Sequence, residues 1–174
     1  MEIYAPLADR MGMNRIRDEL EDLSFSILNK DARKLILDRL IFIKSKREDL
    51  ISKVSEKLAE LLKSKKIDAE ITGREKTPFS IWRKMQSKKI SLEQLTDIVG
   101  FRVIVKNIND CYITLGIFHN KYSMIPGKFK DYISTPKINQ YKSIHTSIIG
   151  PLKKRIEIQI RTESMHEFAE RGIA

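Results

Sequence analysis

Residues 128–162, KFKDYISTPKINQYKSIHTSIIGPLKKRIEIQIRT, contain the pattern that decides the fold of this chain. Over 155–161, isoleucines alternate with Arg, Glu and Gln, which predicts a strand with one apolar face and one polar face. The preceding run, 141–148, has the same two-residue period. Two such runs separated by a short Gly-Pro segment predict an antiparallel hairpin.

The expected register of this hairpin brings chemically active side chains together. A three-residue loop over 150–152 would place His145 opposite Glu157 and Tyr141 opposite Arg161. A carboxylate, an imidazole, an arginine and an aromatic ring on one surface suit a phosphorylated ligand. Polar alternation is also the ordinary pattern of a solvated sheet face, so the periodicity alone leaves both interpretations open.

The composition describes a charged chain of single-domain size. The 174 residues have a net charge of +10, and residues 30–89 hold eighteen Lys and Arg against nine Asp and Glu. Such a basic region attracts nucleotides, nucleic acid or acidic membrane, although many of its lysines can be the solvated face of a helix. The single Cys111 fits a reducing compartment, and the chain lacks a signal-peptide pattern or an apolar run of about 20 residues. We therefore expect a cytoplasmic protein that does not enter a membrane.

Apolar spacing predicts the order of helices and strands along the chain. The expected helices cover 5–29, 31–64, 78–86 and 109–122, and a last one begins near 163. In the first helix, the buried stripe is expected to be Ile16, Leu20, Leu23 and Ile27. Strands are expected over 69–73 and 98–105, and 123–139 reads as a long loop of the kind that often binds a ligand.

A basic turn follows the first expected strand. Gly73 ends the strand, and Lys76, Ser80 and Lys84 follow at four-residue spacing across a helix start. Backbone N–H groups and cations placed in this way suit a triphosphate, although the Walker loop pattern is absent. An ordinary basic turn and helix remains an alternative.

Two carboxylates belong to different expected strands. Asp97 precedes the apolar run 98–105, and Glu157 lies on the polar face of the hairpin. Such a pair can hold Mg²⁺ against nucleotide phosphates, or one of them can act as a general base. Strict alternation places Asp97 and Arg102 on opposite faces unless Gly100 marks a bulge. Asp97 as a cap or a salt-bridge partner is the alternative.

Four motifs in this order resemble the synthetase domain of RelA/SpoT-type (p)ppGpp synthetases. They are GREKTPFSIWRKM (73–85), DIVGFRVIV (97–105), KDYISTPKINQYKSIHT (130–146) and RIEIQIRT (155–162). The opening IYAPLADRMGMNRIRDELEDLSF (3–25) resembles the helical connector that precedes this domain in long, bifunctional members. The resemblance implies an α+β fold with a nucleotidyltransferase-like mixed sheet flanked by helices.

The resemblance also implies a domain organisation and a reaction. Residues 1–64 would be the helical connector with N-terminal helices, and 65–174 the synthetase domain, truncated at its C-terminus and lacking the hydrolase and regulatory domains. The family transfers the β,γ-pyrophosphate of ATP to the 3′-hydroxyl of GDP or GTP with Mg²⁺ and releases AMP. ATP and GDP or GTP are therefore the expected partners, and association with a ribosome or a partner chain stays open.

Site roles carry over by position. Asp97 and Glu157 would be the catalytic and Mg²⁺-binding acids. The residues implied for ATP are Arg74, Lys76, Ser80, Lys84 and Arg102. Those implied for GDP or GTP are Lys128, Lys130, Lys137, Asn139, Tyr141 and His145, with Tyr141 stacking on guanine and His145 also near the ATP phosphates.

The sequence departs from the family pattern next to the stacking tyrosine. Gln140 replaces the usual Gly, so its side chain would be strained if its φ is positive, and Lys142 replaces the usual Gln. Residues 128–131, KFKD, resemble the basic acceptor-loop motif of bifunctional members, with Lys in place of Arg. Two alternatives to an active synthetase are a catalytically weak nucleotide-binding remnant and a basic RNA- or ribosome-binding module.

Overall fold

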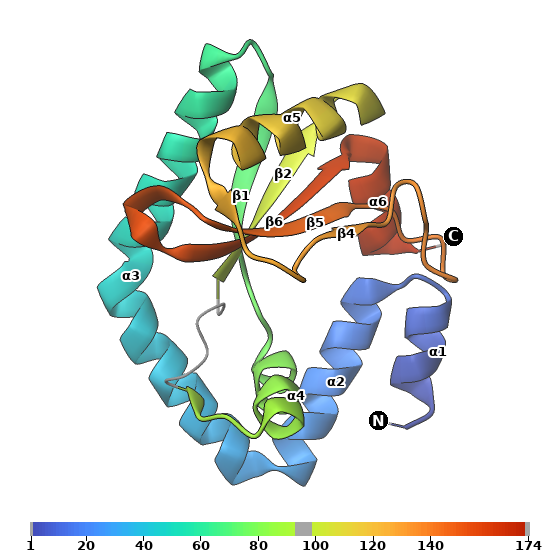
Figure 1. Ribbon diagram of the computed structural model, residues 1–174. Coiled ribbons are helices and arrows are strands. Elements are labelled where there is room, and N and C mark those ends of the chain that lie inside the picture. Colours follow the sequence, from blue (N-terminus) through green and yellow to red (C-terminus); the bar gives the residue numbers. More distant parts are fainter. Residues whose placement is uncertain (1, 93–98, 173–174) are drawn as a thin grey trace.

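A computed structural model describes residues 2–92 and 99–172 (Figure 1). The elements begin with α1 (Tyr4–Arg10), α2 (Asn14–Leu28), α3 (Lys30–Ser64), β1 (Ala69–Glu75), α4 (Pro78–Lys88), β2 (Val99–Val105) and α5 (Ile108–Lys121). They continue with β3 (Ser123–Met124), β4 (Lys130–Asp131), β5 (Ile144–Ile149), a 3-10 turn (Pro151–Lys153), β6 (Arg155–Thr162) and α6 (Glu163–Arg171). The expected long loop thus contains two short strands, β3 and β4.

The strands form one mixed sheet in the order β1-β2-β6-β5-β3, with β4 also pairing with β5. The β2–β6 pair is parallel, and the other pairs are antiparallel. Parallel neighbours need a long crossover connection, and here α5 and the segment through β5 provide it. The predicted α+β fold with a mixed sheet is therefore confirmed. The β1–β2 register is regular over 99–105 and the β2–β6 register over 100–105, so Gly100 is not a bulge.

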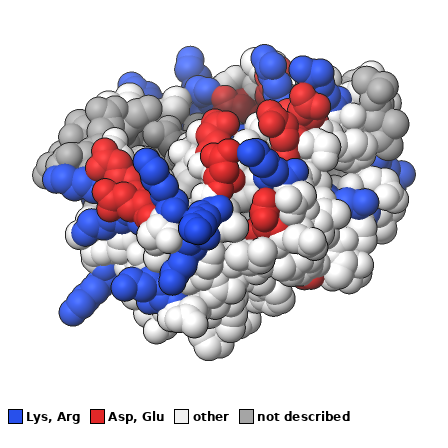
Figure 2. All heavy atoms as spheres, turned by 90° about the horizontal axis from the view of Figure 1, so that it is seen from above, with Lys and Arg blue, Asp and Glu red and all other residues white. Residues whose placement is uncertain are grey.

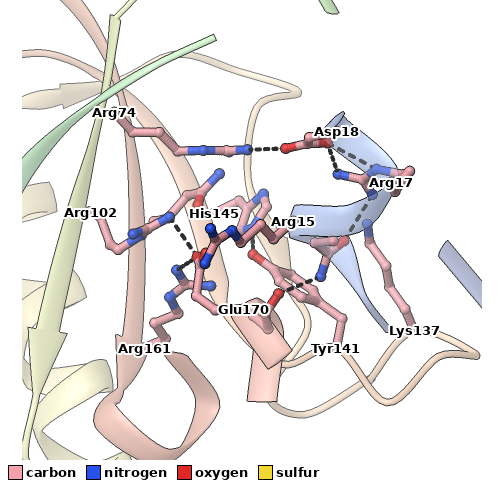
Figure 3. A pocket seen from close by; sticks show the side chains of 13 residues that line it. Arg15, Arg17, Asp18, Arg74, Arg102, Lys137, Tyr141, His145, Arg161 and Glu170 are labelled. Atoms are coloured by element: carbon pink, nitrogen blue, oxygen red, sulfur yellow. Dashed lines mark hydrogen bonds and ion pairs between the residues drawn. The ribbon is translucent and has the colours of Figure 1, made fainter. Parts of the chain in front are cut away.

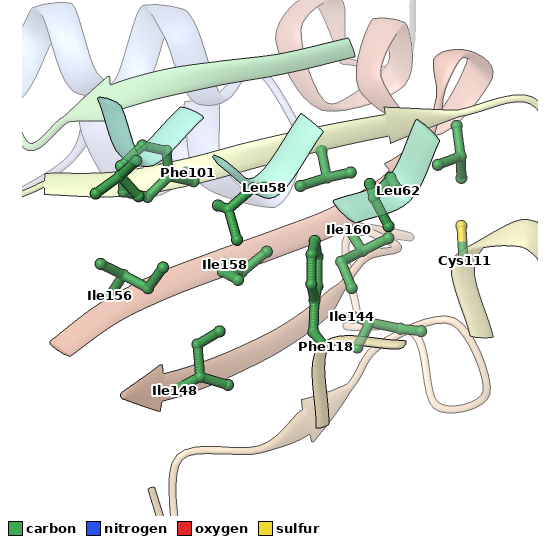
Figure 4. Packing of buried hydrophobic residues seen from close by; sticks show 13 residues of the cluster. Leu58, Leu62, Phe101, Cys111, Phe118, Ile144, Ile148, Ile156, Ile158 and Ile160 are labelled. Atoms are coloured by element: carbon green, nitrogen blue, oxygen red, sulfur yellow. The ribbon is translucent and has the colours of Figure 1, made fainter. Parts of the chain in front are cut away.

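Helices α3 and α5 cover one face of the sheet and form the main core (Figure 4). Leu58 of α3 and Phe118 of α5 are fully buried against the alternating isoleucines of the hairpin, with Ile158 and Ile160 also fully buried. This alternation explains the strand because each second side chain of β6 enters an apolar layer while the intervening ones face the other way.

A second apolar cluster joins the helices at the other end of α3. Phe25 of α2 packs on Phe79 and Trp82 of α4, with ring centroids 5.7 and 5.2 Å apart, and Ile36 of α3 completes the contact. The 35-residue α3 therefore connects two cores. The main core includes residues on both sides of residue 64, where the sequence suggested a domain boundary.

The apolar stripe expected to be buried on the first helix faces solvent instead. Ile16, Leu23 and Ile27 are 46%, 58% and 80% exposed, whereas Glu21 and Phe25 are buried. The side of α2 that faces the sheet is mostly polar, because Asn14, Arg17 and Asp18 on this side line a charged cleft. The packing of Phe25 on α4 sets this rotation, which a search for apolar periodicity cannot detect.

The expected first helix is also interrupted. Gly12, with φ of +73°, separates α1 from α2 and allows the chain to turn. The turn lies against the end of α6, where a Cβ on Gly172 would come within 2.9 Å of the Met11 carbonyl oxygen. Asn14 Nδ2 donates to the Ala169 carbonyl oxygen at 2.9 Å and ties α2 to α6.

The hairpin forms as expected but in a different register. The connection between β5 and β6 is five residues, 150–154, and its first N–H donates to the carbonyl oxygen of its last residue at 2.8 Å. His145 therefore lies opposite Gln159, and Ser147 opposite Glu157. The shift is two residues, so every side chain keeps its predicted face. Left-handed backbone at two loop residues, φ +58° and +55°, makes this wider turn possible, and neither is a glycine.

Ile148 and Ile149, neighbours on β5, test whether the two faces of the sheet are assigned correctly. Ile148 is fully buried, and Ile149 is 42% exposed. We expect Ile148→Ala to lower the free energy of unfolding by about 2–5 kcal/mol, because it leaves a cavity in the core. We expect Ile149→Ala to cost less than about 1 kcal/mol. Urea unfolding followed by circular dichroism measures both, and equal losses would contradict the assignment of faces.

Candidate functional site

The face of the sheet opposite the core collects polar side chains from several strands. The registers align them in two rows across the sheet. One row contains Arg74, Gly100, Glu157 and Ser147. The neighbouring row contains Thr72, Arg102, Gln159, His145 and Lys130. Residues from all four sequence motifs thus meet on one surface.

A cleft of about 280 Å³ lies between this face and the helices α2 and α6 (Figure 3). Its lining comes from the sheet, from both helices and from the loop before β5. The lining residues are Asn14, Arg15, Arg17, Asp18, Arg74, Arg102, Lys137, Tyr141, His145, Gln159, Arg161, Ala169 and Glu170. Six of these side chains are Lys or Arg and two are Asp or Glu, so the cleft is suited to an anionic ligand.

Arg74 and Arg102 reach the cleft from adjacent strands. Arg102 pairs with Thr72, so Arg74, two residues further along β1, is its diagonal neighbour on the same face. Diagonal neighbours in an antiparallel pair are about 7–8 Å apart. Both guanidinium groups therefore belong to the same part of the cleft wall, and guanidinium planes stack well on aromatic rings.

Aromatic rings and a lysine form the other end of the cleft. The Tyr141 hydroxyl and His145 Nε2 are hydrogen-bonded at 2.9 Å, and the direction of this bond depends on the histidine tautomer. Lys137 Nζ lies 5.0 Å from the ring centre of Tyr141 and 5.1 Å from that of Tyr132. The sequence reasoning did not single out Tyr132, which sits edge-on to His145 at 5.2 Å.

His145 is neutral at physiological pH. Its pKa is lowered from 6.5 to about 4, mainly because burial disfavours the charged ring. Glu157 acts in the opposite direction, whereas the nearby cations Lys137 and Arg74 lower the pKa further. The ring can therefore offer a hydrogen bond to a ligand but no positive charge.

The turn before Tyr141 has the strained geometry that the sequence suggested. Gln140 has φ of +59°, a left-handed conformation that favours glycine. Its N–H donates to the Lys137 carbonyl oxygen at 2.8 Å and closes the turn. Asn139, expected near the acceptor nucleotide, also fixes the loop, because its Oδ1 accepts from Tyr141 N and its Nδ2 donates to the Asp9 carbonyl oxygen.

The residues expected to hold ATP phosphates, Lys76, Ser80 and Lys84, are absent from the described lining of the cleft. Lys76 Nζ forms an ion pair with Glu157 Oε2 at 2.9 Å. Thr77 caps α4, and its Oγ1 accepts the Ser80 N–H at 3.2 Å. Ser80 and Lys84 are one turn apart in α4, as predicted.

The two basic residues of the expected acceptor loop lie at the edge of the sheet. Lys130 belongs to β4 and faces His145 across the β4–β5 pair. Lys128 precedes this strand, and both side chains are exposed and lie outside the cleft lining. The structure thus brings Arg74, Arg102, Lys137, Tyr141 and His145 together in the cleft, and the other described candidates do not line it.

A metal site was expected from Asp97 and Glu157. Asp97 lies outside the described residues, and these contain no cluster of three or more His, Cys, Asp or Glu that could hold a metal. Mg²⁺ is usually held by one or two carboxylates together with substrate phosphates. Glu157, half-buried at the start of β6, is a carboxylate of the required kind.

Arg161 and Glu170 also line the cleft, and of these two the sequence reasoning singled out only Arg161, as part of the polar face of the hairpin. The Arg161 side chain is only 2% exposed, and burial lowers its pKa. Glu170 Oε1 accepts from Arg102 Nη2 at 3.1 Å and from Arg161 Nη2 at 3.4 Å, and the latter nitrogen also contacts His166 Nδ1 at 2.8 Å. Strand alternation assigned Arg161 to this face, but Glu170 and the α2 residues are brought to the cleft only by tertiary packing.

Comparison with known proteins identifies the family to which this chain belongs. The model for a region found in RelA/SpoT proteins matches residues 73–174, which includes every strand of the sheet except the start of β1. The chain belongs to the RelA/SpoT family. Its whole length matches a GTP pyrophosphokinase of Brucella melitensis with 53% identity, and it spans 23% of the length of that curated relative.

Solved structures of a small alarmone synthetase share the fold. Small alarmone synthetase 1 from Bacillus subtilis has 25% identity and a TM-score of 0.60, over 76% of this chain and 75% of that one. A second structure of that enzyme, at 23% identity and a TM-score of 0.59, over 76% of this chain and 78% of that one, is bound to its product pppGpp. A third, at 22% identity and 0.56, over 76% and 75%, is bound to AMPCPP. The last two likenesses support the fold alone.

The low pKa of His145 gives a pH prediction. Because the unfolded chain takes up this proton near pH 6.5 and the folded chain only near pH 4, the folded state should lose stability as the pH falls through this interval. We expect an NMR titration to show the ring protonating with a midpoint near 4, with the signal assigned by its loss in His145→Gln. A midpoint near 6.5 would contradict the buried placement.

The positive φ of Gln140 gives a stability prediction. We expect Gln140→Gly to raise the free energy of unfolding by up to about 1 kcal/mol, because glycine adopts the left-handed conformation without a Cβ clash. Lys142→Gly is the control, since Lys142 does not have a positive φ and should lose stability. Urea denaturation measures both variants, and a loss in Gln140→Gly would show that the turn is not strained.

Proposed function

We propose that this chain is a (p)ppGpp synthetase domain that transfers the β,γ-pyrophosphate of ATP to the 3′-hydroxyl of GDP or GTP. The observation that carries the proposal is the cationic cleft, in which Arg74 and Arg102 lie on one side and Tyr141 on the other. Membership of the RelA/SpoT family and the match to GTP pyrophosphokinases support this choice of reaction. Solved structures of a small alarmone synthetase with the same fold hold AMPCPP and pppGpp, so these nucleotides are suitable ligands for testing the proposal.

In this proposal the two nucleotides lie side by side on the polar face of the sheet. Adenine stacks between Arg74 and Arg102, and the ATP phosphates extend toward Lys76 and the start of α4. N–H groups at a helix start attract phosphate oxygens. Guanine stacks on Tyr141, and Lys137, which lies over that ring, moves aside to contact the acceptor.

Glu157 is the proposed proton acceptor. The 3′-oxygen of GDP or GTP forms a bond to the β-phosphorus of ATP, the bond from this phosphorus to the bridging oxygen of the α-phosphate breaks, and AMP leaves. The proton of the 3′-hydroxyl passes to the Glu157 carboxylate, and the adjacent Lys76 ammonium stabilises the negative charge of the phosphates. Mg²⁺, held by Asp97 and Glu157, would neutralise phosphate charge. Neutral His145 donates a hydrogen bond to a phosphate oxygen.

The charge distribution bears on the alternative of a basic RNA-binding module. On the face in Figure 2, Lys and Arg are interspersed with Asp and Glu, beside a broad uncharged area. Binding of a long polyanion favours a continuous basic stripe, and this face has mixed charges.

None of the helices in the described ranges is long and apolar enough to span a bilayer.

A transfer assay tests the proposed function. Purified chain with labelled ATP, Mg²⁺ and GDP or GTP should form ppGpp or pppGpp together with AMP. We expect Asp97→Asn and Glu157→Gln each to reduce kcat by about 100-fold or more, because general-base and metal-binding carboxylates contribute at least this much. Glu167→Gln, which changes an exposed carboxylate of α6, is the control with unchanged kcat.

The outcomes separate the candidates. Nucleotide binding without transfer would favour the catalytically weak remnant over the enzyme. RNA binding that weakens with salt and shows no nucleotide selectivity would favour the RNA-binding module. Undiminished transfer by Glu157→Gln would contradict the role of this carboxylate.

A further inference from the structure

Arg74 and Arg102, the two arginines proposed to stack on adenine, are called the adenine clasp. The guanidinium group of each contacts a carboxylate from a helix outside the sheet (Figure 3). Arg74 Nη2 lies 3.9 Å from Asp18 Oδ2 of α2. Arg102 Nη2 lies 3.1 Å from Glu170 Oε1 of α6. The two pairs thus approach the clasp from two different helices.

Both carboxylates are held by further contacts. Arg17 donates to Asp18 Oδ1 through Nη2 at 2.6 Å and Nε at 3.0 Å, which leaves Oδ2 directed at Arg74. Glu170 Oε1 also accepts from the buried Arg161. These fixed carboxylates can therefore hold a flexible partner in place.

The clasp needs such support for a physical reason. Two guanidinium groups that are diagonal neighbours repel each other, and each long side chain has many rotamers. Arg102 Nε is buried and lacks a hydrogen-bond partner in the described structure, so the bond from Arg102 Nη2 to Glu170 Oε1 restrains this guanidinium. Without the carboxylates, both arginines would separate and turn away from the position that admits a ring.

We propose that Asp18 and Glu170 are positioning residues that hold Arg74 and Arg102 at the separation required for a purine base. The inference rests on the proposed function and extends it, because Asp18 lies on α2, outside the region 73–174 that matches the family model. Asn14 couples the two helices by its bond to the Ala169 carbonyl oxygen. The N-terminal helices thereby become part of the donor-nucleotide site.

Charge and positioning predict different effects on ligands with and without a base. Removing a carboxylate makes the cleft more positive, which should tighten binding of every polyphosphate equally. Loss of positioning weakens only ligands whose base enters the clasp. The informative quantity is therefore the ratio of the Kd of inorganic tripolyphosphate to the Kd of AMPCPP.

Isothermal titration calorimetry of the full chain measures this ratio. We expect Asp18→Asn and Glu170→Gln each to lower it by about 3- to 10-fold, the effect of losing one partly exposed ion pair that orders a binding group. Asp22→Asn is the matched control, because Asp22 lies on the same helix, pairs with Arg33 at 2.6 Å and does not line the cleft. Its ratio should equal that of the wild type.

A double-mutant cycle tests whether Asp18 acts through Arg74. In an Arg74→Ala background, Asp18→Asn should no longer change the ratio. Equal changes in both affinities, as charge alone or a general loss of folding would produce, would overturn the proposal while AMPCPP binding by the wild type still supported the donor site. A wild-type chain that does not bind AMPCPP would instead overturn the proposed function and this inference with it.

Discussion

The parallel pairing of β2 with β6 is the constraint on which the site depends. It sets Gly100 beside Glu157 and Arg102 beside Gln159, and the antiparallel pairs on either side extend these rows to Arg74 and His145. A slip of one residue in this pairing would turn the polar side chains toward α3 and α5 and the isoleucines toward the cleft. The fully buried isoleucines Ile158 and Ile160 therefore hold the polar face in register as well as filling the core.

The walls of the cleft are held in place in two different ways. The sheet wall is backed by the main core, whereas α2 and α6 contribute through ion pairs and a few hydrogen bonds across a polar boundary. This explains why the contact face of α2 carries Asn14, Arg17 and Asp18, while its apolar stripe faces outward. A binding cleft for an anion requires polar walls, and a helix that forms such a wall cannot also bury its apolar face there.

Much of the fold could be predicted because local periodicity and core packing agree. The alternation in 155–161 predicted β6 and its two faces, and the spacing in α4 predicted that Ser80 and Lys84 share a helix side. The hairpin register could not be predicted, because loop length depends on whether residues such as Leu152 accept a left-handed backbone. The buried face of α2 was predicted wrongly. Phe25 packs on Phe79 and sets the rotation of the helix, whereas the apolar residues Ile16, Leu23 and Ile27 are exposed.

For the candidate site, the sequence by itself determined the kinds of chemistry available and the family motifs that carry them. Strand alternation placed Glu157, Gln159 and Arg161 on one face, and the turn before Tyr141 was recognisable as strained from Gln140. Only the tertiary structure decided that Asp18 and Glu170 meet Arg74 and Arg102, and that His145 is buried enough to remain neutral. The physical reason is that periodicity assigns a side chain to a face, whereas ion pairs between distant elements and the loss of solvent depend on how those faces are packed together.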